Sequence, residues 1–251
     1  MAEERRTGPK AAGACRTRRR AKTASAADPN AVGQRPFDIH RFMAALKAEY
    51  RNWNAPIISF IAHRGATPFE ILVSTLLSLR TQDQVTAAAA DRLFEVARTP
   101  RAILKLPLDE LEGLIYPVGF YPTKARRLKS ICRILVDEYD EKVPDSMERL
   151  LALPGVGRKT ANLVLVEGFG QEAICVDTHV HRISNRIGFV RTRDPEQTEF
   201  ALREKLPRQY WVIYNEILVA FGQTLCRPLS PLCSRCAVRD MCQRIGVTKS
   251  R

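Results

Sequence analysis

Apolar residues recur at helical spacing through most of this chain, and short breaks built on proline or glycine separate the helical runs. In residues 68–80 the isoleucines and leucines fall three and four positions apart, which places them on one face of a helix. Alternating strand patterns are nearly absent, so the sequence predicts an all-α fold of about ten helices joined by short loops. Further helical runs cover residues 87–96, 126–139, 147–153, 158–167, 178–187, 195–206 and 211–221, with breaks at Pro107, Pro117, Pro122, Pro144, Pro154, Gly168 and Pro207.

The charge balance points to a polyanionic partner. The 251 residues hold 40 lysines and arginines against 27 acidic residues, a formal net charge of +13. Such a balance favours nucleic acid first and an anionic membrane surface second. No apolar run reaches the length of a membrane span, and residues 1–35 lack the apolar stretch of a signal peptide. These first residues are rich in alanine and arginine, and we expect them to form a disordered basic tail.

A glycine-containing turn joins two of the helical runs, within the string LPGVGRKTANLVL that spans Leu153–Leu165. Pro154 cannot continue the first helix, and Gly155 and Gly157 permit a tight turn with bare backbone. A second helix then starts near Arg158, and its first amides have no partner within the helix. Such a helix N-terminus binds phosphate without reading base sequence. The alternative is an ordinary hairpin of two helices with a glycine turn.

A lysine and an aspartate follow this turn at positions suited to chemistry. Lys159 lies in the first turn of the second helix, where the positive helix end and Arg158 both favour a neutral, nucleophilic amine. Asp177 ends an apolar stretch and opens the next helix, from where its carboxylate would face the lysine and assist proton transfer. The alternatives are an exposed helix lysine and an ordinary N-cap aspartate.

Four of the seven cysteines crowd into seventeen residues near the C-terminus, in the pattern C-x6-C-x2-C-x5-C. Four thiolates with such short loops between them are typical of a [4Fe–4S] cluster. Structural zinc is the alternative, although zinc ribbons usually offer two C-x2-C pairs and this chain has one. The four candidate ligands are Cys226, Cys233, Cys236 and Cys242, whereas Cys15, Cys132 and Cys175 have no evident partner.

Taken together, the hairpin with Lys159, the V-D-T-H string of residues 176–179 and the cysteine spacing resemble the endonuclease III family of DNA glycosylases. The resemblance runs from about Phe37 to Cys242. It implies a helix-hairpin-helix glycosylase fold, with two helical domains flanking a DNA-binding cleft. Residues 61–171 would form a six-helix barrel domain, and residues 36–60 with 172–251 an iron–sulfur domain. It makes Lys159 the nucleophile, Asp177 its catalytic partner and the four clustered cysteines the ligands of a [4Fe–4S] cluster.

The resemblance also implies the residues that contact DNA. Two segments, residues 76–83 and 118–121, resemble the loops that enter the base stack in this family. Arg80 stands where many relatives have glutamine and would fill the gap left by a flipped base. Phe120 stands where many have leucine and would act as a wedge, with packing in the core as its alternative. The other predicted DNA-binding residues are Gly155, Val156, Gly157, Arg158, Thr160 and His179. In the loop between Cys226 and Cys233 only Arg227 is charged, which leaves Arg235 and Arg239 to supply phosphate contacts there.

The function implied is that of a bifunctional DNA glycosylase and abasic-site lyase. Such an enzyme removes oxidised pyrimidines from duplex DNA and nicks the strand by β-elimination through a lysine Schiff base. We expect a monomer in the cytoplasm of a bacterium, or in the nucleus or mitochondrion of a eukaryote. One alternative is a monofunctional mismatch or damage glycosylase, whose relatives lack a lysine at position 159. Adenine glycosylases also carry a further C-terminal domain, for which we expect no room in the nine residues after Cys242. Another is a non-enzymatic helix-hairpin-helix DNA-binding module.

Overall fold

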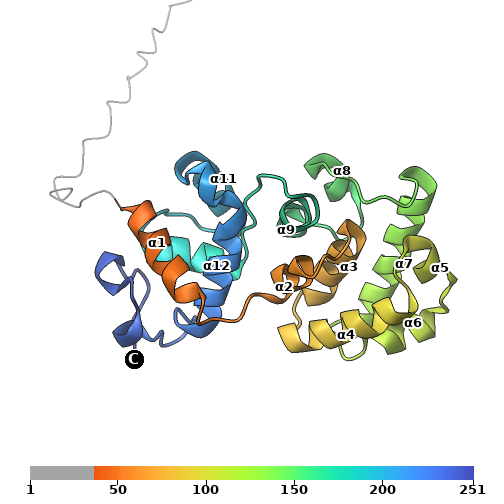
Figure 1. Cartoon of the computed structure of the whole chain (residues 1–251), viewed down its shortest axis with the longest axis horizontal. Coiled ribbons are helices and arrows are strands. Elements are labelled where there is room, and N and C mark those ends of the chain that lie inside the picture. Colours follow the sequence, from red (N-terminus) through yellow and green to blue (C-terminus); the bar gives the residue numbers. More distant parts are fainter. Residues whose placement is uncertain (1–36) are drawn as a thin grey trace, which may run out of the picture. The chain divides into compact units, whose positions relative to one another are not determined.

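The computed structural model describes residues 37–251, so the predicted basic tail lies outside the described residues. Within them the fold contains twelve α-helices, three short 3₁₀ turns and no strand, which confirms the all-α prediction with two helices more than expected (Figure 1). The helices are α1 (Ile39–Tyr50), α2 (Ile57–His63), α3 (Pro68–Ser78), α4 (Asp83–Val96), α5 (Pro100–Lys105), α6 (Leu108–Ile115), α7 (Tyr121–Glu138), α8 (Met147–Ala152), α9 (Arg158–Phe169), α10 (Thr178–Arg186), α11 (Pro195–Lys205) and α12 (Trp211–Thr224). No helix of residues 37–251 has both the length and the apolar character needed to cross a membrane.

Helix α7 begins five residues earlier than its apolar pattern predicts. Pro122 lies inside the first turn of this helix, where the sequence analysis expected a break. Proline is tolerated there because the amides of a first turn have no partner within the helix. The prediction of a break at Pro122 is therefore wrong, and Phe120, the residue before the helix, is its N-cap.

Helix α3 starts with a capping box that the sequence encodes locally. The hydroxyl of Thr67 accepts a hydrogen bond from the amide of Glu70 at 3.3 Å, and the Glu70 carboxylate accepts one from the amide of Thr67 at 2.8 Å. Two amides that the helix leaves unpaired are satisfied in this way. The cap fixes the start of a helix in which nine of eleven residues are buried.

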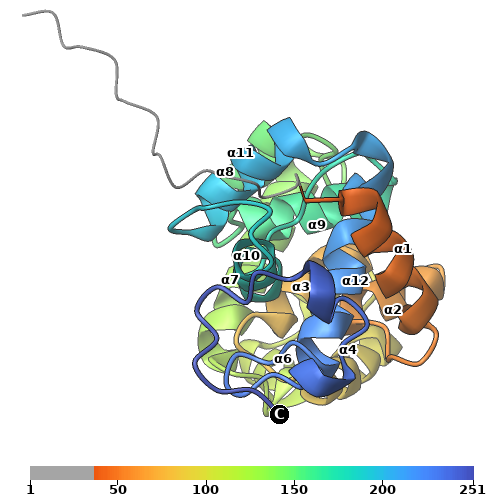
Figure 2. The same ribbon diagram turned by 90° about the vertical axis from the view of Figure 1, so that its left-hand side faces the viewer.

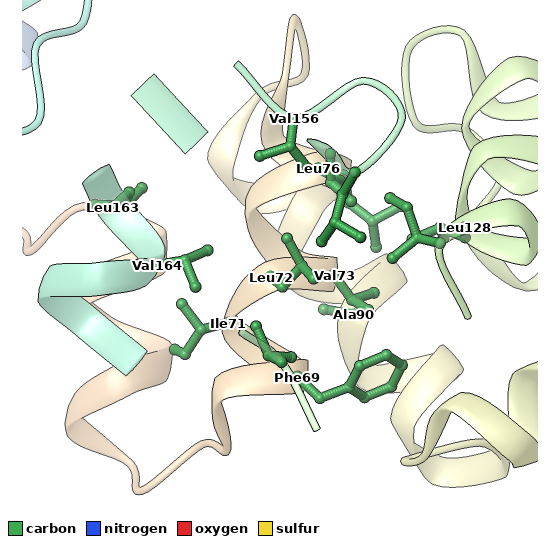
Figure 3. Close-up of a cluster of buried hydrophobic side chains, with 14 of the residues drawn as sticks. Phe69, Ile71, Leu72, Val73, Leu76, Ala90, Leu128, Val156, Leu163 and Val164 are labelled. Carbon is green, nitrogen blue, oxygen red and sulfur yellow. The ribbon is translucent and has the colours of Figure 1, made fainter. Parts of the chain in front are cut away.

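The larger of two hydrophobic cores surrounds helix α3, which packs against α2, α4, α7 and α9. Figure 3 shows Val164 of α9 directed toward Ile71 and Leu72 of α3, all three of them buried. Val156, in the glycine turn before α9, is also part of this core. The turn and the helix that follows it are thereby held by apolar packing.

The second core is built from the N-terminal helix α1 together with α10, α11 and α12. Figures 1 and 2 both place α1 beside α12, although more than 150 residues separate them in the sequence. Trp53, which follows α1, stacks on Phe221 of α12 with ring centroids 5.6 Å apart. Each core has its own set of helices, and α2 belongs to the larger core through Ile58. The predicted domains, residues 61–171 and 36–60 with 172–251, stay a prediction.

Candidate active site

A cleft of about 790 Å³ is lined by residues on helices that contribute to both hydrophobic cores. Lys159 enters it from the first turn of α9, and Asp177 enters it from the start of α10. These two residues lie on separate elements, so the fold brings together the pair that the sequence analysis expected to face each other. The remaining lining comes from residues 54–60, 78, 81–84 and 87, from Leu163, Thr178 and His179, and from Asn215, Val219 and Gln223 of α12.

The two glycines of the turn before α9 differ in whether the fold requires them. Gly155 has φ +80°, a left-handed conformation that side chains rarely adopt, and a Cβ there would lie 3.0 Å from Cδ of Arg127. Gly157 has φ −101° and open space around the position of a Cβ. The protein itself therefore requires glycine at position 155 but not at position 157.

The N-terminus of α9 presents backbone rather than side chains. Gly157 is its N-cap, and no side chain of the described residues caps the helix there. The predicted DNA-binding residues Val156 and Thr160 are buried, at 6% and 2% exposure. The amide of Val156 already donates to the carbonyl oxygen of Leu153 at 3.1 Å, so a ligand contact here must use other amides, such as that of Thr160. Unpaired amides at a helix N-terminus form an anion site.

Arg158, another predicted DNA-binding residue, is engaged within the protein. Its guanidinium donates two hydrogen bonds to Glu199 of α11, at 2.6 and 2.9 Å, and lies 5.0 Å from the ring centroid of Phe200. A bidentate pair of this kind fixes both position and orientation. The charge beside Lys159 is therefore balanced by Glu199, which the sequence analysis did not foresee.

Glu199 is the buried anchor of this end of α9. Its side chain is 3% exposed and also accepts from Arg203 at 3.0 Å. Burial alone would raise the pKa of Glu199, but the hydrogen bonds and charges of Arg158 and Arg203 outweigh it and lower the pKa. The ionised carboxylate thus joins α11 to the helix that carries Lys159.

Asp177 is both an N-cap and a cleft residue. One of its carboxylate oxygens, Oδ1, accepts hydrogen bonds from the amides of His179 and Val180, each at 2.8 Å. The side chain is 9% exposed and lines the cleft with Lys159. Capping and a role in the cleft are therefore compatible, because the two amides hold the carboxylate in one rotamer.

His179 lines the same cleft from the first turn of α10. Its Nδ1 lies 3.1 Å from a guanidinium nitrogen of Arg182, and its ring packs so closely on Gly222 of α12 that no Cβ would fit there. Burial lowers the pKa of His179, the charge of Asp177 opposes this effect, and the charge of Arg182 adds to it. A neutral ring can accept the hydrogen bond from Arg182.

Arg80 and Phe120 lie together outside this cleft. They line a neighbouring cavity of about 420 Å³, and the Arg80 guanidinium carbon lies 5.8 Å from the centroid of the Phe120 ring. Phe120 is 62% exposed, so its alternative role in the core is wrong. Its backbone is the N-cap of α7 and has the left-handed conformation, with φ 60°.

The four clustered cysteines surround one small pocket. They line it together with apolar side chains of α10, α12 and the C-terminal loops, and none of the four forms a disulfide. A guanidinium nitrogen of Arg186 lies 3.3 Å from Sγ of Cys226, and the amide of Arg244 lies 3.3 Å from Sγ of Cys242. Burial raises the pKa of Cys236 to about 11 and the neighbouring thiols add to this, so a positive centre is needed to hold all four as thiolates.

Several residues that shape the site were not found from the sequence. Glu199 and Gly222 act through contacts with residues more than forty positions away, which no local pattern marks. Only the spacing of Glu199 and Arg203, four apart on one helix, hinted at a pair. Asn54 and its neighbours in the segment before α2 line the cleft without any motif.

Known proteins resemble this chain closely. The family model described as HhH-GPD superfamily base excision DNA repair protein matches residues 73–208. Endonuclease III of Thermotoga maritima is 51% identical over 181 residues, which cover 72% of this chain and 85% of that protein. Endonuclease III homolog 2, chloroplastic, of Arabidopsis thaliana is 46% identical over 69% of this chain, and the match spans 47% of that longer protein.

Solved structures agree with this relationship. A non-covalent endonuclease III–DNA complex aligns with a TM-score of 0.74 at 35% identity, covering 82% of this chain and 94% of that one. A trapped covalent endonuclease III–DNA intermediate aligns with a TM-score of 0.70 at 34% identity, over 82% and 95% of the two chains. The helix-hairpin-helix glycosylase fold of the superfamily is therefore confirmed. The chain belongs to the endonuclease III family.

We predict that Glu199→Gln destabilises the fold. Glutamine has nearly the same shape but offers an amide group where the guanidinium groups of Arg158 and Arg203 need acceptors. Since both arginines are about 30% exposed, we expect a loss of about 1–3 kcal/mol, less than for a fully buried pair. Denaturant unfolding of the variant and the parent at pH 7 measures it.

Glu196→Gln is the matched control. Glu196 contacts the same guanidinium but is 67% exposed and lies 4.0 Å away, so this ion pair is weak. It should change the free energy of unfolding by less than about 0.5 kcal/mol. Folding lowers the pKa of Glu199. Its contribution to the free energy of unfolding is therefore complete above its ordinary pKa of 4.5, and it is lost as the pH falls through the lowered pKa of the folded state. Equal stability of parent and Glu199→Gln at pH 7 would contradict the assignment.

Proposed function

We propose that this chain is a bifunctional DNA glycosylase and abasic-site lyase of base excision repair. The observation that carries the proposal is a single cleft lined by an amine, Lys159, and a carboxylate, Asp177, from the N-termini of two helices. Membership in the endonuclease III family supports it. So does the likeness to a structure in which endonuclease III is covalently trapped on DNA.

The chemistry assigned to Lys159 is nucleophilic. Its neutral amine attacks C1′ of the damaged nucleotide, a bond forms between Nζ and C1′, and the bond from C1′ to the base breaks. Opening of the sugar ring then gives an imine. Loss of a C2′ proton expels the 3′ phosphate by β-elimination, and water finally releases the lysine. This sequence of steps nicks the strand on the 3′ side of the lesion.

Asp177 assists these steps from the N-cap of α10, which lines the same cleft. One of its carboxylate oxygens is held by two amides, which leaves the second free to act toward the cleft. There it stabilises positive charge on the sugar as the base leaves, and it takes a proton from the attacking amine. His179 keeps the first turn of α10 in place through its contact with Arg182 and supports the adjoining DNA surface.

DNA binding is assigned to the glycine turn and the first turn of α9. Gly155, Gly157, Arg158 and Thr160 bind backbone phosphate through main-chain amides, which reads no sequence. Val156 supports this site by holding the turn through its hydrogen bond to Leu153 and its packing in the larger core. The open space at Gly157 supports this, because the fold needs no glycine there while an approaching phosphate does. The bidentate contact of Arg158 with Glu199 supports a backbone rather than a side-chain role for Arg158.

Arg80 and Phe120 are assigned to the opened base stack. An exposed aromatic ring beside a guanidinium can stack in the space vacated by a flipped nucleotide, and the guanidinium can bond to the orphaned partner base.

The substrate class that we propose is an oxidised pyrimidine in duplex DNA, and abasic sites are the substrate of the lyase step. We propose that the protein acts as a monomer, in the cytoplasm of a bacterium or in the nucleus or mitochondrion of a eukaryote.

The four cysteines fit a [4Fe–4S] cluster. Four thiols line one pocket, two of their sulfurs receive N–H contacts, and the surroundings are apolar, all of which suit a buried cluster. The C-x6-C-x2-C-x5-C spacing favours such a cluster over zinc. Among residues 37–251, no three His, Cys, Asp or Glu side chains are grouped closely enough to hold one metal ion. When bound, the cluster would be held by Cys226, Cys233, Cys236 and Cys242 and would order the C-terminal loops.

We predict that Gly157→Ala weakens DNA binding without harming the fold. The added methyl group meets no protein atom within 4 Å, so stability should change by less than about 1 kcal/mol. The methyl group does obstruct a phosphate at the helix end, so affinity for an undamaged duplex should fall by about tenfold. Fluorescence anisotropy measures it. Gly113→Ala, also in open space but on α6, is the control and should bind like the parent.

We predict that borohydride traps the parent on a duplex containing thymine glycol, and that Lys159→Ala abolishes the adduct. Reduction converts the imine into a stable amine, so the adduct reports the lysine directly. Lys205→Ala, an exposed lysine of α11, should trap like the parent. Base loss revealed only by alkali would assign a monofunctional glycosylase, and binding with neither adduct nor base loss would assign a DNA-binding module.

We predict that the protein purified without oxygen contains iron and acid-labile sulfide in equal amounts, with no stoichiometric zinc. Cys236→Ala removes a ligand and should lose most of both elements, together with the visible absorbance of the cluster. Cys132→Ala, which changes a buried cysteine of the larger core, should retain them. Stoichiometric zinc without sulfide would overturn the cluster assignment.

A further inference from the structure

Lys124 of α7 is a buried lysine with an unusual set of partners. It is 7% exposed, and its Nζ lies 2.8 Å from the carbonyl oxygen of Leu77, 2.6 Å from that of Leu79 and 3.1 Å from the hydroxyl of Thr81. An ammonium has three donors, and these three acceptors use all of them. No acidic residue lines the adjoining cavity, whose other charged residues are Arg80 and Arg127.

These partners lie on the segment that carries Arg80. Leu77 is at the end of α3, and Leu79 and Thr81 flank Arg80. The hydroxyl of Thr81 also accepts a hydrogen bond from the amide of Gly119 at 3.2 Å. One lysine and one hydroxyl therefore tie the segment of Arg80 to the segment that leads into Phe120.

The two tied segments touch along their backbones. A Cβ on Gly119 would lie 2.6 Å from the carbonyl oxygen of Arg80, closer than real contacts allow. Lys124 itself follows Phe120 by one helical turn, and its amide donates to the carbonyl of Phe120 at 3.0 Å. The position of Phe120 relative to Arg80 is therefore set by this small group of contacts.

Both residues of the pair have strained backbones. Arg80 has φ 54° and Phe120 has φ 60°, the left-handed region that costs non-glycine residues about 1–2 kcal/mol each. Packing in a core does not offset this strain for either side chain, because Phe120 is 62% exposed and Arg80 is also exposed. Burial lowers the pKa of Lys124 to about 8, which reflects the cost of holding an ammonium at this point. Strain that persists at an exposed pair points to a functional use.

We propose that Lys124 is a positioning residue, which holds Arg80 and Phe120 as a preformed pair for insertion into duplex DNA beside the flipped nucleotide. This inference rests on the proposed function of the pair. Insertion must push against base stacking, and a pair whose backbones yielded would leave the base in place. Lys124 touches neither the damaged base nor the sugar, and it acts through the two residues that it fixes.

The chain offers a matched control on the same helix. Lys129 of α7 donates to the carbonyl oxygens of Leu104, at 3.0 Å, and of Leu106, at the end of α5. Lys124→Met and Lys129→Met therefore make the same chemical change and remove the same kind of contact. Only the first change lies beside Arg80 and Phe120.

The test compares two substrates. With Lys124→Met, single-turnover release of thymine glycol from a duplex should slow by about tenfold to a hundredfold, as expected for a misplaced group. Nicking of an abasic site in single-stranded DNA needs no insertion and should stay within about twofold of the parent. Fluorescence of 2-aminopurine, placed beside the base opposite the lesion, should rise on binding of the parent and not of this variant. Lys129→Met should behave like the parent in all three measurements.

Equal slowing on both substrates, or unchanged duplex excision by a folded Lys124→Met, would overturn the proposal. Should Lys124→Met not fold, Gly119→Ala keeps the lysine and its methyl group forces apart the segments of Arg80 and Phe120, so the same split between the two substrates is expected. No difference between the substrates for Gly119→Ala also counts against the proposal. The parent's own excision and trapping are measured first, so that failure of the proposed function is recognised separately.

Discussion

Helix α9 is buried along most of its length against α3, and its first turn is anchored by the ion pair of Arg158 with the buried Glu199. The first amides of the helix have no partner within it, and the packing fixes their position. They therefore stay available to an external anion. Lys159 is part of the same turn. The packing of one helix thus fixes two things together, the place where a phosphate binds and the place from which the amine reaches the cleft.

Three residues assigned to DNA contact have a residue type or a backbone conformation that the fold does not require. Gly157 has a backbone conformation that any residue could adopt, whereas Arg80 and Phe120, like four other non-glycine residues of the described chain, have a positive φ that suits glycine better. Local preference and global structure usually agree in a natural sequence, so such disagreements at positions with a proposed role support that role. Gly155 differs from them, because the fold itself requires glycine there.

The sequence predicted the helical class, the hairpin and the residues of the candidate site because each has a local signature. The helical period of the apolar residues predicted the long helices, and the spacing within the motifs predicted Lys159, Asp177 and the four cysteines as candidate site residues. Short helices such as α5 and α6 escaped because six to eight residues with two buried positions show no clear period. The exposed setting of Phe120 and the buried setting of Lys124 escaped for another reason. Both follow from contacts with the segment around Arg80, about forty residues earlier, and only the folded chain contains them.

The cysteine loops are joined to the cleft through α10, which carries Asp177 as its N-cap. Arg186, at the end of this helix, donates to the carbonyl oxygens of Arg227 and Pro228, and Arg182 donates to that of Cys226. The same guanidinium of Arg182 contacts His179, whose amide binds the carboxylate of Asp177. Arg186 is buried and Arg182 is half-buried, so neither can lose these acceptors without a penalty. Order in the cysteine loops and the orientation of α10 therefore depend on each other, and a cluster that fixed the loops would also hold the helix from which the carboxylate acts.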